Sequence, residues 1–483
     1  MIRLTALALA TAVACSSTQA APAAAWTLPP AIGAALAKAH VPPSALALWV
    51  QPVDAPSPSW GWNPDFGVNP ASVFKLVTTS AALDTLGPAW TWKTGVFVTG
   101  PIRKGVLDGS VVIVGSGDPS LVMERVWLLL RQLRDAGVRD IRGDIVLDHS
   151  GFAAGTRSAA DFDNLPAEPY NVLPDALLMN FRAVTLSFQP DAQARVARVT
   201  AEPPLAGLAI DATVPLSRGD CDDWRGALRL GADNATRWRF SGAYPASCGA
   251  RSWPLAYPDP ASYESRLVSA LWHEVGGRLR GKVRDGTLPD GATPAFTFES
   301  PQLAQIVRDI NKYSNNTMAE QLFLTLARSP SAQLAATATD VRQEQARAVL
   351  SQWLHQRLGT AADGVVVVNG SGLARETRIS ARTLAQLLQS DWNSPTMPEL
   401  MSSLPISGVD GTLRKSAAPA GRAHLKTGSM RDVVAVAGYV MADSGRRWIL
   451  VAVINDPNAG AARPAIDAAI DWVAHDAAQA AAP

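Results

Sequence analysis

The chain has 483 residues, of which 47% are hydrophobic, and this length is above what one hydrophobic core usually supports. Lysine and arginine number 43 against 42 aspartates and glutamates, which gives a formal net charge of +1. This balance excludes a general electrostatic reason to expect nucleic acid or an anionic membrane as a partner.

Residues 1–25 have the pattern of a secretory signal peptide followed by a tether. Arg3 supplies a positive start, residues 4–14 are apolar, and small residues follow them. We expect cleavage near residues 20–25. The alternative is lipidation of Cys15, because the tripeptide that ends there weakly matches the cleavage site of bacterial lipoproteins. No other stretch approaches the roughly 18 apolar residues that a membrane span needs.

A short apolar strand is expected at residues 44–53 and a helix at residues 69–86, closed by Gly87-Pro88. The helix carries Ser72-Val73-Phe74-Lys75, the only S-x-x-K in the chain. Residues i and i+3 share a helix face, so the Ser72 hydroxyl and the Lys75 amine can come within hydrogen-bond reach. Apolar neighbours predict that Lys75 is buried, which lowers a lysine pKa and favours a role as general base. A solvated helix face is the alternative for this motif alone.

Residues 92–297 contain short β-like runs separated by turn signals, with their clearest helix at residues 126–136. Strands and helices at both ends of the chain can complete one sheet-and-helix domain. We therefore expect a domain formed by residues 26–91 and 298–483, and an insertion of one or two β-rich domains at residues 92–297.

Cys221 and Cys248 lie within this insertion and remain as a pair if Cys15 leaves with the signal or carries lipid. In an oxidising compartment such a pair favours a disulfide. A zinc site and two buried free thiols are the alternatives, although two cysteines without a nearby histidine pair make a poor zinc shell.

Ser314-Asn315-Asn316 is the only S-x-N in the chain and interrupts two helical patterns, at residues 302–312 and 317–327. Such a break presents polar groups at a loop. The alternative is a simple N-cap, in which Ser314 or Asn316 caps the helix that follows.

Lys426-Thr427-Gly428 precedes two expected strands, at residues 432–440 and 448–455, and a closing helix at residues 465–474. Glycine would let a substrate backbone approach a sheet edge closely, and a lysine followed by a hydroxyl can hold a carboxylate. A second copy of the tripeptide, Lys93-Thr94-Gly95, comes before the S-x-N motif and so has the wrong order.

The three motifs in the order S-x-x-K, S-x-N and K-T-G resemble those of the penicillin-binding proteins and serine β-lactamases. Within these, the long gap between Lys75 and Ser314 resembles the low-molecular-mass, class C D-alanyl-D-alanine carboxypeptidase/endopeptidase family, whose catalytic domain is split by a long insert. Six further segments carry the resemblance through most of the mature chain: residues 117–119, 143–148, 169–172, 174–177, 369–373 and 407–413. The departures are Asn369, where many relatives have Asp, and Ser429, where Thr is common.

The resemblance implies an α/β (α+β) catalytic domain of the serine β-lactamase/DD-peptidase type, split by a β-rich insert. It also implies that Ser72 is the nucleophile, that Lys75 takes its proton, and that no metal or organic cofactor is needed. Ser314 would relay a proton to the leaving amine, and Asn316 would position Lys75 and the substrate amide.

The same resemblance assigns substrate binding to the third motif. Lys426, Thr427 and Ser429 would bind the terminal carboxylate around Gly428, and the charge of Lys426 would keep Lys75 neutral. The backbone N–H groups of Ser72 and Ser429 would form the oxyanion hole.

The implied substrates are peptidoglycan peptides that end in D-Ala-D-Ala and cross-links between D-Ala and a diamino acid. β-Lactams would acylate Ser72 as covalent inhibitors. We expect a periplasmic enzyme with no nucleic-acid partner and at most peripheral contact with the membrane.

Two other functions are open on the same scaffold. A serine β-lactamase would deacylate quickly, but class A enzymes carry S-D-N and a deacylating glutamate, whereas Asn315 replaces that Asp here. A non-catalytic wall-binding protein is disfavoured by the intact Ser72, Lys75, Ser314 and Lys426.

Overall fold

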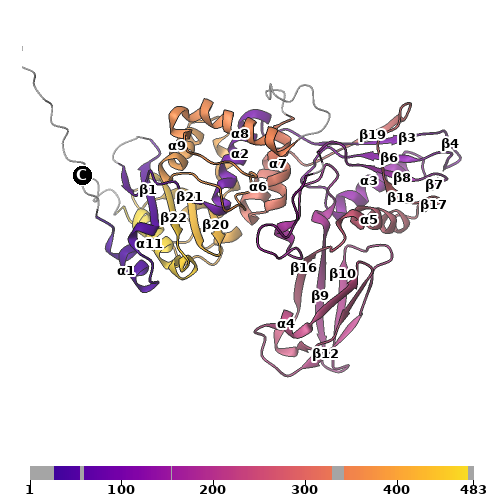
Figure 1. Cartoon of the computed structure of the whole chain (residues 1–483), viewed down its shortest axis with the longest axis horizontal. Coiled ribbons are helices and arrows are strands. Elements are labelled where there is room, and N and C mark those ends of the chain that lie inside the picture. The colour runs from indigo at the N-terminus through magenta and orange to yellow at the C-terminus, as the bar shows by residue number, and fades with distance from the viewer. Residues whose placement is uncertain (1–26, 55–58, 154, 329–341, 477–483) are drawn as a thin grey trace, which may run out of the picture.

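The computed structural model describes residues 27–54, 59–153, 155–328 and 342–476. The predicted signal segment and Cys15 lie outside the described residues. Within the described ranges, no helix is long and apolar enough to cross a membrane. In Figure 1 the two ends of the chain, indigo and orange to yellow, lie together, and the magenta middle of the chain extends away from them.

A five-stranded antiparallel sheet joins the first and last parts of the chain. β1 pairs along its full length with β22, so the start of the described chain is completed by its end. The order of the strands is β2 (Trp60–Trp62), β1 (Leu46–Pro52), β22 (Arg447–Asn455), β21 (Val433–Met441) and β20 (Ala423–Met430). The three central strands are buried along nearly all of their length, as expected for a sheet that is covered on both faces.

Alternate residues of these strands pack into two separate apolar cores. One face carries Leu48, Val436 and Leu450 and is covered by α1 (Pro30–Lys38) and α11 (Arg463–Ala474). The other face carries Trp49, Ala437 and Val451. The helices on that side are α2 (Lys75–Leu86), α6 (Leu303–Tyr313), α7 (Asn316–Leu326), α8 (Gln343–Leu358), α9 (Ala381–Trp392) and α10 (Met397–Ser403).

The strands expected at residues 44–53, 432–440 and 448–455 are confirmed as β1, β21 and β22, with ends moved by one or two residues. The K-T-G tripeptide precedes the last two strands, as expected, and lies within a further strand, β20. Leu425 and Lys426, which are adjacent in β20, are both buried, so the strand shows no regular alternation of buried and exposed residues.

Among the described residues, the chain between these parts forms four more sheets. Two of them pack with α3 (Met123–Asp135) and α5 (Pro260–Glu274). Val126, Leu129, Leu130 and Leu133 give α3 one apolar face that explains its burial. The strand orders are β18 (Val283–Asp285), β8 (Ile145–Asp148), β6 (Val111–Val114), β3 (Lys93–Val98) and β19 (Thr293–Glu299), and β17 (Arg278–Leu279), β7 (Asp140–Ile141), β5 (Val106–Leu107) and β4 (Ile102–Arg103).

Residues 183–256 form the two remaining sheets and a short helix. The strand orders are β15 (Tyr244–Pro245), β12 (Thr213–Ser217), β10 (Val196–Glu202), β9 (Ala183–Asp191) and β16 (Arg251–Ala256), and β11 (Ala209–Ile210), β14 (Arg237–Phe240) and β13 (Leu230–Asn234), with α4 at Trp224–Leu228. Single 3₁₀ turns occur at Pro43–Ala45, Ala71–Phe74, Pro169–Asn171, Asn180–Arg182, Ala246–Cys248, Gly359–Ala362, Gly411–Leu413 and Ala459–Ala462.

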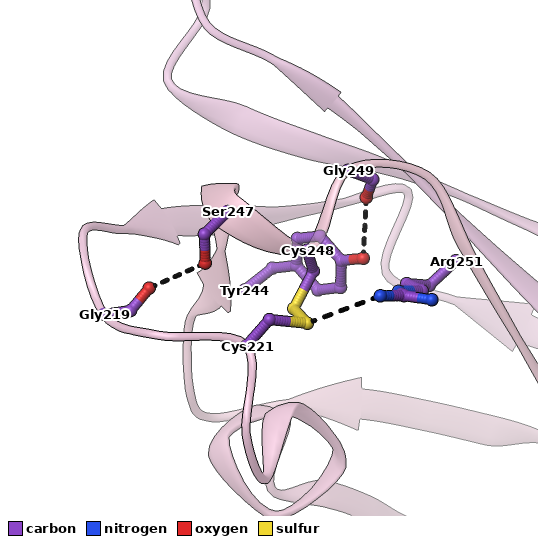
Figure 2. The surroundings of a disulfide bond; sticks show 7 residues. All are labelled: Gly219, Cys221, Tyr244, Ser247, Cys248, Gly249 and Arg251. Atoms are coloured by element: carbon purple, nitrogen blue, oxygen red, sulfur yellow. Dashed lines mark hydrogen bonds between the residues drawn. A yellow bond between two sulfur atoms is a disulfide. The ribbon is translucent and has the colours of Figure 1, made fainter.

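The expected disulfide between Cys221 and Cys248 is confirmed, with an S–S distance of 2.03 Å. It joins the loop before α4 to the 3₁₀ turn that follows β15 (Figure 2). Ser247 donates a hydrogen bond to the Gly219 carbonyl across the same two segments, at 2.9 Å. The bridge therefore lies within residues 183–256, which contain none of the three sequence motifs.

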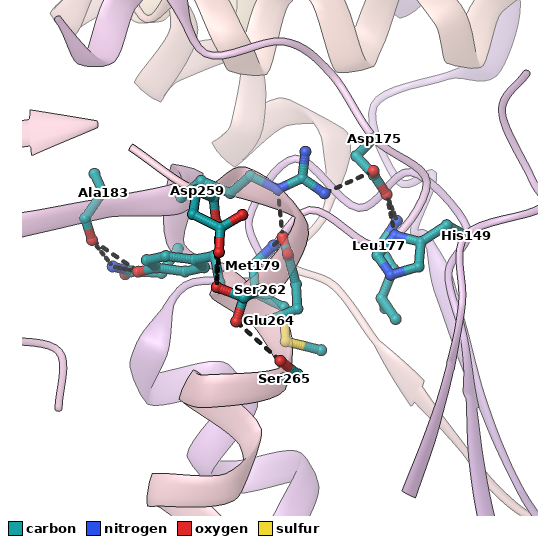
Figure 3. A network of polar contacts seen from close by, with 12 residues as sticks. His149, Asp175, Leu177, Met179, Ala183, Asp259, Ser262, Glu264 and Ser265 are labelled. Carbon is teal, nitrogen blue, oxygen red and sulfur yellow. Dashed lines mark hydrogen bonds and ion pairs between the residues drawn. The ribbon is translucent and has the colours of Figure 1, made fainter. Parts of the chain in front are cut away.

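A network of charged residues, the junction network, lies between residues 92–297 and α7 (Figure 3); Glu264 is buried, and His149, Asp175 and Arg182 are partly buried. Asp175 is hydrogen-bonded to His149 at 2.5 Å and to Arg182 at 2.7 Å, and Arg182 also pairs with Glu264 of α5 at 2.7 Å. The Gln321 side chain on α7 hydrogen-bonds both the N–H and the carbonyl of Asp175, at 3.0 and 2.8 Å. This network ties the insertion to the helix that follows the S-x-N motif.

Candidate active site

Ser72 and Lys75 lie where a 3₁₀ turn, Ala71–Phe74, runs into α2. The sequence predicted one helix from residue 69; instead the tighter turn occupies its start. The Lys75 Nζ lies 2.8 Å from the Ser72 Oγ, so the predicted contact between the two groups is present. Val73, Phe74, Leu76 and Val77 are fully buried around Lys75, which is itself 0% exposed.

The backbone before Ser72 is held by side chains rather than by regular structure. Ala71 has a φ of 47°, a left-handed conformation that is costly for a residue other than glycine. Its N–H donates to the Asn69 Oδ1 at 2.8 Å, and Asn69 exchanges two hydrogen bonds with Asn455 of β22, at 2.8 and 2.9 Å. The turn that presents Ser72 is thus fixed to the central sheet.

The Lys75 amine has three acceptors. Besides Ser72, it contacts the Asn316 Oδ1 at 2.5 Å and the Ser371 carbonyl at 2.7 Å. Burial lowers the pKa of Lys75 well below its ordinary value, the positive charge of Lys426 lowers it further, and Glu320 opposes both. An amine with a lowered pKa, in contact with a serine hydroxyl, can act as a general base.

Ser314 lies in the break between α6 and α7, with a φ of 58°. The alternative N-cap hypothesis named Ser314 or Asn316, but the cap is Asn315, whose Oδ1 accepts from the Met318 N–H at 3.0 Å. Asn315, the middle residue of the motif, therefore caps the N-terminus of α7. The side chains of Ser314 and Asn316 are left to contact the two lysines.

Lys426 on β20 is fully buried, and its Nζ lies 2.9 Å from the Ser314 Oγ. It also donates to the Thr427 carbonyl at 2.6 Å. Burial lowers the pKa of Lys426 to about 7. The Thr427 hydroxyl meets the Thr412 hydroxyl at 2.7 Å, and Ser429 Oγ accepts from Arg463 at 3.0 Å.

Gly428 is required by the close approach of β20 to the Ser72 turn. A Cβ at this position would lie 2.4 Å from the Pro70 carbonyl oxygen and 3.2 Å from the Val73 nitrogen. The edge strand of the sheet and the turn that carries Ser72 are thus in backbone contact. The second copy of the K-T-G tripeptide, Lys93-Thr94-Gly95, lies on β3, where Lys93 pairs with Glu299 at 4.0 Å.

The structure thus brings together residues of the three predicted motifs, which we call the catalytic group: Ser72, Lys75, Ser314, Asn316 and Lys426. Lys75 is hydrogen-bonded to Ser72 and Asn316, and Lys426 is hydrogen-bonded to Ser314. Sequence reasoning gave no role to Ser371, whose backbone carbonyl binds Lys75, nor to the Tyr170 carbonyl, which accepts from Asn316 at 3.4 Å. Both lie in segments that carried the family resemblance, but backbone acceptors leave no side-chain signal. Among the described residues, no cluster of histidine, cysteine, aspartate or glutamate could hold a metal ion.

Comparison with known proteins gives a family match over nearly the whole described chain. The profile described as "D-Ala-D-Ala carboxypeptidase 3 (S13) family" matches residues 28–477. The D-alanyl-D-alanine carboxypeptidase of Actinomadura sp. (strain R39) is 27% identical over 83% of this chain and 76% of its own length.

Solved structures show the same fold. Penicillin binding protein 4 from Haemophilus influenzae has a TM-score of 0.71 at 20% identity, covering 91% of this chain and 99% of its own; a second structure of it contains a β-lactam. A predatory endopeptidase from Bdellovibrio bacteriovorus, acylated by penicillin G, has a TM-score of 0.53 at 15% identity and covers 89% and 92%. The expected fold class is confirmed.

Proposed function

Because the chain belongs to the D-Ala-D-Ala carboxypeptidase 3 (S13) family, we propose that it hydrolyses peptidoglycan stem peptides through an acyl-enzyme on Ser72. The match confirms the family that the motifs resemble. The observation that carries the proposal is the catalytic group, in which two buried lysines each contact a serine hydroxyl. The role given to each residue is part of the proposal.

Acylation begins with the transfer of the Ser72 hydroxyl proton to the Lys75 amine. This requires a neutral lysine, and burial with the nearby charge of Lys426 lowers the pKa of Lys75 in that direction. The Ser72 Oγ then forms a bond to the carbonyl carbon that precedes the last D-alanine. Asn316 holds the amine in line through its Oδ1 contact at 2.5 Å.

The negative charge that develops on the carbonyl oxygen needs fixed donors. The backbone N–H groups of Ser72 and Ser429 supply them, because β20 lies in contact with the Ser72 turn at Gly428. Such donors typically contribute about 3–4 kcal/mol each to the stabilisation of the transition state.

Collapse of the intermediate breaks the C–N bond, and the proton that Lys75 took from Ser72 passes to the leaving amine with Ser314 as the relay, which leaves Lys75 neutral. Lys426 and Thr427 bind the carboxylate of the departing D-alanine, since a buried ammonium beside a hydroxyl is suited to a carboxylate. Water then attacks the ester carbonyl and gives a proton to Lys75. The bond between the carbonyl carbon and the Ser72 Oγ breaks, and Lys75 returns the proton to this oxygen, which restores the free Ser72 hydroxyl.

The substrates we propose are peptides that end in D-Ala-D-Ala and cross-links between D-Ala and a diamino acid. Two kinds of relative support this pair: a D-alanyl-D-alanine carboxypeptidase and an endopeptidase acylated by penicillin G. Penicillins would acylate Ser72, and the resulting acyl-enzyme would hydrolyse slowly. A periplasmic location follows from the expected signal segment, and residues 92–297 are proposed as the insertion between the two catalytic parts.

The test incubates the mature protein with cross-linked and uncross-linked wall peptides and follows D-Ala release and peptide size by mass spectrometry. Products that penicillin blocks support the proposal and separate carboxypeptidase from endopeptidase activity. Rapid, repeated turnover of penicillin would instead support a β-lactamase. A folded protein that yields no product from any of these would contradict the proposal and favour a wall-binding protein.

A further inference from the structure

A buried carboxylate lies behind the catalytic lysine. Glu320 follows Asn316 by one turn of α7, and its side chain is 6% exposed. One oxygen accepts from the Ser371 hydroxyl at 3.2 Å, and the other pairs with Arg157 at 3.0 Å. No step of the proposed mechanism uses this carboxylate, and a buried charge is costly unless it is paired.

Ser371 connects Glu320 to Lys75. Its carbonyl accepts from the Lys75 amine at 2.7 Å, while its hydroxyl donates toward Glu320 and Asn369. The Leu373 N–H in turn donates to the Ser371 hydroxyl at 3.1 Å. A change at Glu320 therefore alters the position of one of the three acceptors that hold the catalytic amine.

The partner of Glu320 comes from the insertion. Arg157 lies in the segment that follows β8 in sequence, far from α7 along the chain, and its side chain is 35% exposed. Arg157, Leu173, Glu320 and Gln343 each line both of two cavities, of about 460 and 300 Å³. The ion pair is thus one of the points at which residues 92–297 reach the surroundings of Lys75; the Tyr170 carbonyl, which accepts from Asn316, is another.

We propose that Glu320, held by Arg157, is a positioning residue for Lys75, and that the insertion acts on the catalytic base through this ion pair. The inference rests on the proposed function, because it assigns Glu320 an effect on acylation at Ser72. It gives the insertion a role in the chemistry besides any contact with substrate.

The charges around Lys75 and Glu320 determine whether the pKa of Lys75 rises or falls when Glu320 is changed. Lys75 faces Lys426, which favours the neutral amine, and Glu320, which favours the ammonium. Burial raises the pKa of Glu320, and Arg157 and Lys75 oppose that rise. The cavity walls also carry six other charged side chains: Asp161, Arg342, Glu344, Arg347, Arg375 and Glu376.

Glu320→Gln keeps the acceptor for Ser371 and removes the charge. The pKa of Lys75 should fall, so the acid limb of the pH–rate profile for acylation by a fluorescent penicillin should move down by about one pH unit. The plateau rate should also fall, because a less basic amine is a weaker base. Arg157→Gln should move the limb the same way, since Glu320 without its counter-charge takes up a proton.

The double variant distinguishes this coupling from two separate structural effects. Arg157→Gln should add nothing in the Glu320→Gln background, and Arg157→Lys should retain the wild-type limb because it keeps the charge. Arg375→Gln is the matched control, since it removes an arginine from the same cavity wall without a contact to Glu320. Its acid limb should coincide with that of the wild type.

Single variants with the wild-type acid limb, or shifts that add in the double variant, would overturn the inference. If Glu320→Gln does not fold, the Arg157→Gln and Arg157→Lys pair still decides it, because Arg157 lies on the rim of the cavities. Failure of the wild-type protein to be acylated at any pH would overturn the proposed function itself.

Discussion

The catalytic group and the junction network are both polar and at least partly buried, but their charged residues have opposite kinds of partner. In the junction network each charge meets an opposite one: Arg182 lies between Asp175 and Glu264, and His149 pairs with Asp175. In the catalytic group the two lysines contact hydroxyl, amide and carbonyl oxygens, and no carboxylate touches either amine among the described residues.

The pKa shifts follow from this difference. The charges around Asp175 and Arg182 keep both groups ionised, whereas burial without a direct counter-ion lowers the pKa of Lys75 and Lys426. Contacts between opposite charges stabilise the fold, whereas a buried lysine without a counter-ion has a lowered pKa and can exchange a proton. Variants in the two regions should therefore fail in different ways.

The largest effect is expected at Lys75. Lys75→Ala removes the proposed base, so the rate of acylation by penicillin should fall by about 10²–10⁴-fold while the protein stays folded. Stopped-flow or gel-based labelling of equal amounts of folded protein measures this rate. Labelling as fast as in the wild type would show that another group takes the Ser72 proton.

Arg182→Met should have the opposite consequence, because it should lower the free energy of unfolding more than it lowers the rate of acylation. It leaves Asp175 and Glu264 buried without their shared partner, which typically costs about 3–5 kcal/mol of unfolding free energy. Denaturant unfolding followed by fluorescence would measure the loss. The exposed pair of Arg198 and Asp191 supplies the control, since Arg198→Met should leave the transition unchanged.

Gly428→Ala should separate β20 from the Ser72 turn. The added methyl would lie 2.4 Å from the Pro70 carbonyl oxygen, so the strand must move and take the proposed Ser429 donor with it. A displacement of about 1 Å can reduce a catalysed rate by about 10²-fold. Acylation rates at saturating penicillin would show this reduction, and an unchanged rate would mean that the strand can shift without loss of the donor.

Lys426→Met gives a smaller change, of opposite sign to that of Glu320→Gln. Loss of the Lys426 charge should raise the pKa of Lys75, so the acid limb of acylation should move up in pH, by about one unit. The effect should be present below about pH 7 and fade above it, because Lys426 itself loses its proton near pH 7. A limb that stays in place would show that Lys426 does not act on Lys75 through its charge.

The sequence predicted the parts of the molecule that depend on side-chain identity and regular periodicity. The three motifs, the disulfide pair and the apolar strands β1, β21 and β22 each leave such a signal. The K-T-G motif was expected beside a sheet edge, but the bounds of β20 were not predicted because this strand includes a buried lysine. The Asn315 cap was missed because three adjacent polar residues offered the same chemistry.

Other features could not be read from the sequence because they depend on distant segments meeting. The Ser371 carbonyl presents no side-chain signature, and its place beside Lys75 results from the packing of residues 369–373 against the Ser72 turn. Arg157 and Glu320 are separated by the greater part of the insertion, so neither residue predicts the other.

Mapping the penicillin adduct tests the central claim most directly. The mature protein would be incubated with penicillin, its intact mass recorded, and the modified peptide sequenced by tandem mass spectrometry. We predict one adduct per chain, carried by Ser72 and absent from Ser72→Ala. An adduct on another residue, or equal labelling of the Ser72→Ala variant, would contradict the assignment of the nucleophile.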